Sequence, residues 1–142
     1  MLNETSELLK PLLTQIILTI AVWIYMYITR VNSMMRNRVK VQDLATDEGF
    51  LKIKDAENPS DNFENLFELP VLFYVLILVL AYLGRADFIF LFGAWFFVIT
   101  RICHSIVHCT FNHVMTRFVL YFSGAIVLFG MWIRLCYSIV IG

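Results

Sequence analysis

Charged residues are scarce in this chain of 142 residues. Only 15% of the residues are Asp, Glu, Lys or Arg, whereas 60% are hydrophobic; soluble domains usually contain about 25% charged residues. This composition excludes a single small soluble domain, which could not bury so much apolar surface, and it indicates a protein that crosses a membrane several times. The formal net charge is zero, so we expect no nucleic-acid partner.

Cysteines are also few, and they lie within or beside apolar stretches: Cys103, Cys109 and Cys136. They form no CxxC pair and no framework typical of secreted proteins, so we expect small buried side chains and no disulfides. We also expect no cleavable signal peptide. The first apolar run begins only after Lys10 and Pro11, follows two glutamates, and ends without a small-residue cleavage site.

Four apolar segments are long enough to cross a membrane as α-helices. They cover about residues 12–29, 66–83, 88–109 and 118–141. Each has roughly the 17 to 25 residues that a hydrocarbon core about 30 Å thick requires. We therefore predict one domain over residues 1–142, an all-α integral membrane bundle of four transmembrane helices.

The connections between these segments differ in length. A polar turn over residues 84–87 makes the second and third segments an antiparallel hairpin, and residues 110–116 form a short loop before the fourth. The long connection over residues 30–65 begins with basic residues, which we expect to extend the first helix beyond the bilayer. Near its end, Ser60 or Asp61 is expected to cap the second helix.

The basic residues predict the orientation of the chain. Six of them lie in the long connection: Arg30, Arg36, Arg38, Lys40, Lys52 and Lys54. The turn at 84–87 contains only Arg85, and the N-terminal tail only Lys10. The positive-inside rule therefore places residues 30–65 on the cytoplasmic side and both termini on the other. Arg134 then lies near the far interface, where its side chain can snorkel to water. The short loops and the lack of a further targeting segment suggest a bacterial inner membrane.

A polar stripe interrupts the third apolar segment. Arg101, His104 and His108 are three and four residues apart, so a helix places them on one face. A polar group that faces lipid is costly, so this face must point into the bundle or toward an aqueous site. Arg117 and Tyr121 follow, again four residues apart, at the start of the fourth segment.

The start of the second segment has polar residues at a matching depth. Asn65 and Glu68 are one helical turn apart, and antiparallel packing brings this end beside the cytoplasmic ends of the third and fourth segments. We therefore expect one polar cluster near the cytoplasmic side. Its members are Asn65, Glu68, His104, His108, Arg117 and Tyr121, with Arg38 as a further cation from the long connection.

This polar cluster has two interpretations. Glu68 could neutralise Arg101 in a purely structural network. Alternatively the cluster binds a ligand, which we favour because six polar groups exceed what a bundle needs to fix its register. Its cations, carboxylate, amide and imidazoles suit a small zwitterionic or anionic solute with carboxylates and an amine, and the bilayer could supply an apolar co-substrate. Glutathione meets this description.

The spacing of these residues resembles that of a known family. The third and fourth segments read R-x-x-H-x-x-x-H and R-x-x-x-Y, starting at Arg101 and Arg117, and N-x-x-E starts at Asn65. Together these motifs are similar to those of the membrane-associated proteins in eicosanoid and glutathione metabolism, the MAPEG family. The four-segment layout and the long first connection agree with it as well.

The resemblance implies a four-helix bundle that assembles as a homotrimer and binds glutathione between subunits near the cytoplasmic side. It implies that Asn65 and Glu68 help to hold glutathione, that His104 lines the site, and that Tyr121 lies one turn beyond the catalytic residue. That residue would be Arg117, whose guanidinium would stabilise the glutathione thiolate. A thiol with a pKa of about 8.5 is mostly protonated at neutral pH, so a neighbouring cation favours the reactive thiolate.

The activity implied is that of a membrane-bound glutathione-dependent transferase or peroxidase. Its second substrate would be a hydrophobic electrophile or a lipid hydroperoxide taken from the membrane lipids. Two positions depart from the family pattern. Asp61 replaces an arginine four residues before the motif asparagine, where an acid would repel a glutathione carboxylate, and His108 replaces the usual tyrosine.

Two alternatives remain open. Asp61 and His108 favour a non-catalytic member that binds a lipid or a protein partner through the same cavity. The i, i+4 spacing of His104 and His108, with Cys103, Cys109 and His113 nearby, would also suit a His-ligated metal or haem.

Overall fold

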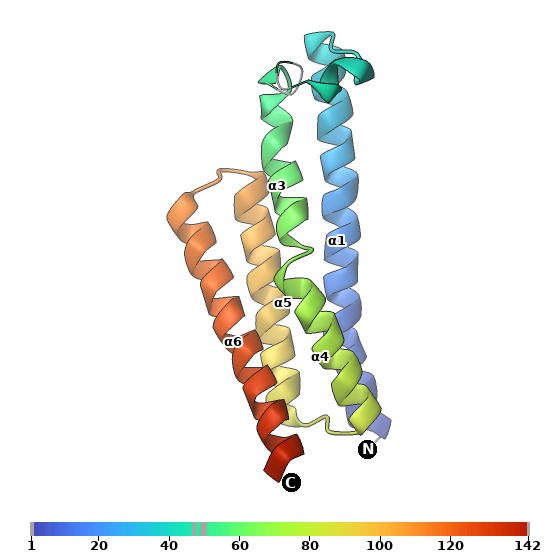
Figure 1. Ribbon diagram of the computed structural model, residues 1–142, viewed down its shortest axis with the longest axis vertical. Helices are drawn as coiled ribbons and strands as arrows, with labels where there is room; N and C mark the ends of the chain where they lie inside the picture. Colours follow the sequence, from blue (N-terminus) through green and yellow to red (C-terminus); the bar gives the residue numbers. More distant parts are fainter. Residues whose placement is uncertain (1, 47, 49–50, 142) are drawn as a thin grey trace.

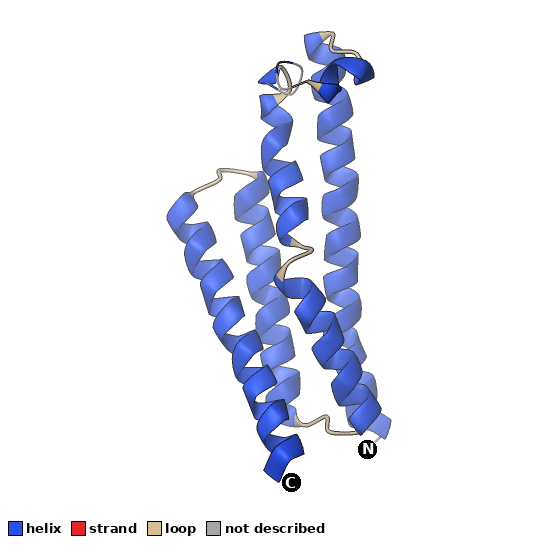
Figure 2. Cartoon of the chain, viewed as in Figure 1, coloured by secondary structure: helices blue, strands red, loops and turns tan. Residues whose placement is uncertain are grey.

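The computed structural model describes residues 2–46, 48 and 51–141, and these residues form helices joined by short connections (Figure 2). The main helices are α1 (Leu2–Asn37), α3 (Glu57–Asn65), α4 (Leu69–Leu83), α5 (Phe88–Cys109) and α6 (Val114–Ile141). Two short 3₁₀ helices, η1 (Val41–Ala45) and η2 (Lys54–Ala56), lie in the long connection. Within the described part of the chain, four stretches are long and apolar enough to span a membrane: Ser6–Asn37, Glu57–Leu83, Phe88–Cys109 and Val114–Ile141. The predicted all-α fold with four spanning segments is confirmed.

The helices lie side by side as an antiparallel bundle (Figure 1). The interior is apolar, and its fully buried side chains include Phe73 and Leu76 of α4, Phe97 of α5 and Leu128 of α6. The rings of Phe73 and Phe97 stack 4.7 Å apart. Large apolar side chains also cover the outside of the bundle. Such an exterior is expected where lipid is the solvent.

The first and last helices are longer than the apolar runs predicted. α1 extends from Leu2 to Asn37, compared with residues 12–29 from hydropathy, and α6 begins at Val114. A helix continues into polar sequence once it leaves the hydrocarbon, so hydropathy marks only the part that crosses it. The expected extension of the first helix into basic residues is confirmed. In Figure 1, α1 and α3 reach beyond the loop that joins α5 and α6.

The second spanning segment consists of two helices, α3 and α4, with a break at residues 66–68. The apolar helix predicted over about 66–83 corresponds to α4, which begins three residues later, at Leu69. Glu68 at the break has φ −92° and ψ −100°, outside helical values. Pro70 lies in the first turn of α4. In a continuous helix its ring would clash with the carbonyl of Leu66, four residues earlier, and it has no N–H to donate. The break exposes Glu68 at the point where the polar residues of α5 and α6 lie.

The predicted helix cap at Ser60 or Asp61 was also wrong. Both residues lie inside α3, which begins at Glu57 with Ala56 at the N-cap position. Pro59 does not prevent this earlier start, because N–H groups in the first turn of a helix have no intrahelical acceptor.

Candidate functional site

Tyr121 of α6 lies at the centre of the polar residues. Its hydroxyl donates a 2.8 Å hydrogen bond to Oε2 of Glu68, at the break between α3 and α4. Its ring centroid lies 4.8 Å from the guanidinium carbon of Arg101 and 5.9 Å from the ring of His104, both on α5. One side chain therefore brings together the break in the second segment and the polar stripe of the third.

Arg101 is almost completely buried, with 1% of its surface exposed. Its Nη2 donates a 3.0 Å hydrogen bond to the carbonyl of Leu120, and its guanidinium also lies over the ring of Phe97. Gly124 makes room for it, because a Cβ there would lie 3.3 Å from Nη2 and 2.7 Å from Oγ1 of Thr100. Across the described residues no ion pair joins Arg101 to Glu68. Tyr121 mediates between the two, in place of the direct neutralisation considered above.

The two histidines of the stripe lie in contact with each other, their rings 5.6 Å apart. Nδ1 of His104 lies 3.2 Å from the carbonyl oxygen of Arg117. A carbonyl only accepts, so Nδ1 carries a proton in this hydrogen bond. Nε2 of His104 and both ring nitrogens of His108 are buried without a hydrogen-bond partner in the described chain. Buried polar atoms in proteins are nearly always satisfied, so these nitrogens identify this part of α5 as a place where a ligand group could bind.

Arg117 is held by the loop between α5 and α6. Its Nη1 donates a hydrogen bond to Oδ1 of Asn112, whose own Nδ2 donates 2.8 Å to Oδ1 of Asn58 in α3. Asn112 has φ +49°, in the left-handed region that Asn tolerates better than most residues. The chain Asn58–Asn112–Arg117 thus connects α3 to the proposed catalytic guanidinium.

No role was predicted from the sequence for Asn62 of α3, whose side chain is fully buried against α5. Its Oδ1 accepts a 3.3 Å hydrogen bond from Ser105, and its Nδ2 donates 3.3 Å to Sγ of Cys109. The i, i+4 spacing of Asn58 and Asn62 places both amides on the face of α3 that meets α5. That spacing could have predicted from the sequence that both amides lie on one face of this helix.

Two predicted residues lie apart from this network. Asn65 donates a 2.9 Å hydrogen bond to the carbonyl of Asp61 within α3, and the break separates it from Glu68. Arg38 lies just beyond α1 with an exposed side chain and φ +53°, and it has no described contact with the other predicted residues. Glu68, His104, His108, Tyr121 and the backbone of Arg117 are the predicted members that the structure brings together.

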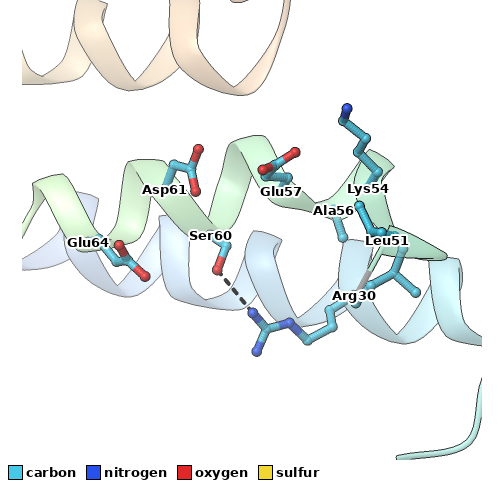
Figure 3. A pocket seen from close by; sticks show the side chains of 9 residues that line it. Arg30, Leu51, Lys54, Ala56, Glu57, Ser60, Asp61 and Glu64 are labelled. Carbon is cyan, nitrogen blue, oxygen red and sulfur yellow. Dashed lines mark hydrogen bonds between the residues drawn. The ribbon is translucent and has the colours of Figure 1, made fainter. Parts of the chain in front are cut away.

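A cavity of about 520 Å³ opens between α1 and α3 (Figure 3). Arg30 of α1 points toward α3 and donates a 3.0 Å hydrogen bond to Ser60 (Figure 3). Lys54, Asp61 and Glu64 also line the cavity. Its size falls in the range of small-molecule pockets, and its lining includes both signs of charge. None of the predicted site residues lines this cavity. Asn65 donates a hydrogen bond to the backbone carbonyl of Asp61, which does line it.

The described residues contain no group of three His, Cys, Asp or Glu side chains placed to hold a metal ion. The geometry therefore lends no support to a metal centre at His104 and His108.

These observations define a class of protein: a multi-pass α-helical membrane protein with a buried polar cluster where three helices meet. The MAPEG family model matches residues 8–137, nearly the whole chain. The chain belongs to the MAPEG family. No curated protein and no solved structure matches it.

Proposed function

We propose that this protein is a membrane-bound glutathione-dependent transferase or peroxidase acting on hydrophobic electrophiles or lipid hydroperoxides. The proposal rests mainly on the contacts of Tyr121 with Glu68, Arg101 and His104. These contacts bring together residues of the N-x-x-E, R-x-x-H-x-x-x-H and R-x-x-x-Y motifs. Membership of a family that includes glutathione transferases and peroxidases supports it.

The chemistry requires a thiolate. The backbone carbonyl of Arg117 accepts a hydrogen bond from His104, and its guanidinium is held by Asn112. This cation would favour loss of the glutathione proton. In a transfer reaction the thiolate sulfur forms a bond to the electrophilic carbon, and the leaving group departs with its electron pair. In a peroxidase reaction two glutathione thiols supply two electrons and two protons, so the hydroperoxide becomes an alcohol and water while glutathione becomes its disulfide.

The remaining groups can hold the rest of glutathione. The lining of the α1–α3 cavity includes side chains of both charges, Arg30, Lys54, Asp61 and Glu64, and these suit a ligand with carboxylates and an ammonium group. We propose that these groups face the cytoplasm, that three copies form the functional assembly, and that the membrane is a bacterial inner membrane. Light scattering of the detergent-purified protein tests the trimer.

Glutathione binding tests the proposed site directly. We expect calorimetry on the detergent-purified full chain to give a submillimolar to millimolar dissociation constant that rises in both Glu68→Gln and Arg117→Ala. Lys52→Gln, an exposed change in the long connection, serves as the control and should bind as wild type does. Absence of binding to correctly folded wild-type protein would overturn the proposal.

One observation favours a second candidate, a non-catalytic member that binds a lipid or a protein partner. Asp61 lines the α1–α3 cavity, where a carboxylate opposes binding of a glutathione carboxylate. Absence of both glutathione binding and turnover of an aryl halide or a lipid hydroperoxide, in correctly folded protein, would support this candidate.

A further inference from the structure

A second cavity, of about 620 Å³, lies at the opposite end of the bundle. It is formed by the turn between α4 and α5 together with the last turns of α6, which end beside each other in Figure 1. Its lining includes Arg85, Asp87, Phe90, Arg134, Tyr137 and Ile141. None of these residues belongs to the proposed glutathione site.

Within this cavity Arg134 forms an ion pair with Asp87. Nη1 and Nη2 of Arg134 donate hydrogen bonds of 2.9 and 2.6 Å to the two carboxylate oxygens of Asp87, and the guanidinium lies 4.3 Å from the ring centroid of Phe90. The sequence predicts that Arg134 lies near the far interface, and the structure shows that its side chain forms a bidentate ion pair with Asp87 in the turn before α5. This pair is neutral overall.

Arg85 supplies the remaining charge. Its side chain is exposed, and its only hydrogen bond in the described part of the chain is the donation from Nη1 to the carbonyl of Ser138. Because Asp87 balances Arg134, the charged lining of the cavity has one positive charge in excess. The other guanidinium N–H groups of Arg85 remain for an anion, and a planar guanidinium binds phosphate oxygens well.

The position of the cavity indicates which anion reaches it. It lies where three spanning helices end or begin, at Leu83, Phe88 and Ile141. Tyr137 and Ile141 line it and are exposed by 65% and 66%, and Tyr82 close to the same turn is exposed by 90%. Exposed tyrosines at helix ends are typical of the level of lipid headgroups.

We propose that this cavity binds the phosphodiester of an anionic phospholipid. Arg85 contacts the phosphate, the Asp87–Arg134 pair fixes the opposite wall, and the first part of an acyl chain lies against Tyr137 and Ile141. Two features favour a lipid over a free anion: the apolar side of the cavity, and its location at the boundary of the hydrocarbon.

Native mass spectrometry of the full chain in detergent tests this proposal. Delipidated protein is titrated with short-chain phosphatidylglycerol, with phosphatidylcholine, and with inorganic phosphate. We expect phosphatidylglycerol to bind most tightly. Arg85→Gln should weaken its binding about tenfold, as loss of a charge-assisted contact predicts. Arg85→Lys should retain part of the affinity, because it keeps the charge but not the planar fork.

Lys10→Gln is the matched control, since Lys10 is a cation at the same end of the bundle that already pairs with Glu7 at 2.6 Å. It should leave lipid binding unchanged. Equal binding of the two lipids by wild-type protein would overturn the proposal, as would equal loss in Arg85→Gln and Lys10→Gln. Full displacement of the lipid by inorganic phosphate would show a simple anion site and also overturn it. Melting curves for each variant establish that its fold is intact.

Discussion

Tyr121 donates a 2.8 Å hydrogen bond to Glu68, and this contact joins the middle of the polar cluster to the only break in the spanning part of the described helices. The same ring covers the guanidinium of buried Arg101. Direct pairing of Glu68 with Arg101 was one of two interpretations of the sequence; in the structure the two residues are coupled through an aromatic ring and its hydroxyl. The arrangement leaves Glu68 exposed beside the cluster, available to a ligand.

Removing the hydroxyl of Tyr121 should slightly lower the stability of the folded protein. We expect Tyr121→Phe to lower the free energy of unfolding by about 1 kcal/mol, the net value of one hydrogen bond. Tyr121→Leu should cost more, because Arg101 also loses its cation–π contact. Thermal unfolding in detergent measures both. A double-mutant cycle with Glu68→Gln should show that the effects of Tyr121→Phe and Glu68→Gln are not additive; additive losses would contradict the contact.

Gly124 should not tolerate a side chain. A Cβ there would approach Thr100 and Arg101, both buried, so we expect Gly124→Ala to lower stability by about 1 to 3 kcal/mol. Gly130, on the same helix, has nothing within 4 Å of the position of a Cβ. Gly130→Ala should therefore leave stability unchanged or raise it by about 0.5 to 1 kcal/mol, since Ala favours a helix. Equal melting temperatures for the two variants would argue against a close approach at Gly124.

Asn112 should act on catalysis through Arg117. We expect Arg117→Ala to lower kcat/KM for conjugation of glutathione to an aryl halide about 100-fold. Asn112→Gly suits the positive φ and removes only the side chain, so it should lower kcat/KM about tenfold through misplacement of the guanidinium. Asn112→Asp keeps the acceptor oxygen for Arg117 and should remain closer to wild type. Full activity of Asn112→Gly would exclude a positioning role.

The Asp87–Arg134 pair should make stability depend on pH in acid. Hydrogen bonds from Arg134 lower the pKa of Asp87 below its ordinary value of 3.8. A lowered pKa in the folded state means that this contribution is complete well above pH 3.8 and is lost as the pH falls through the lower folded value.

Two variants of Asp87 separate its roles. Both partners are partly exposed, so at neutral pH we expect Asp87→Asn to lower stability by at most about 1 kcal/mol. The difference from wild type should shrink at about pH 2. Asp87→Ala also loses the helix cap to the N–H of Phe90, and should cost about 1 kcal/mol more. Melting curves in detergent across this pH range measure both effects; a difference that grows in acid would contradict the assignment.

Part of the detail that sequence reasoning missed was available from local rules. Pro70 predicts the break at residues 66–68, because a proline there cannot continue a helix from α3. The spacing of Asn58 and Asn62 predicts an amide-lined face. The pairing of Asp87 with Arg134 could not be predicted in this way, because the two residues are 47 positions apart and meet only when α6 packs against the start of α5.

The amino-acid sequence by itself determined that this protein spans the membrane with four helices, and that polar groups on the third must face inward. Lipid offers no partner for polar groups, so length and hydropathy suffice for both conclusions. Only the tertiary structure decided that Tyr121 mediates between Glu68 and Arg101, and that Asn112 holds Arg117. Periodicity specifies the face of a helix on which a side chain lies. The rotation and depth at which the faces of three helices meet follow from packing of the whole bundle.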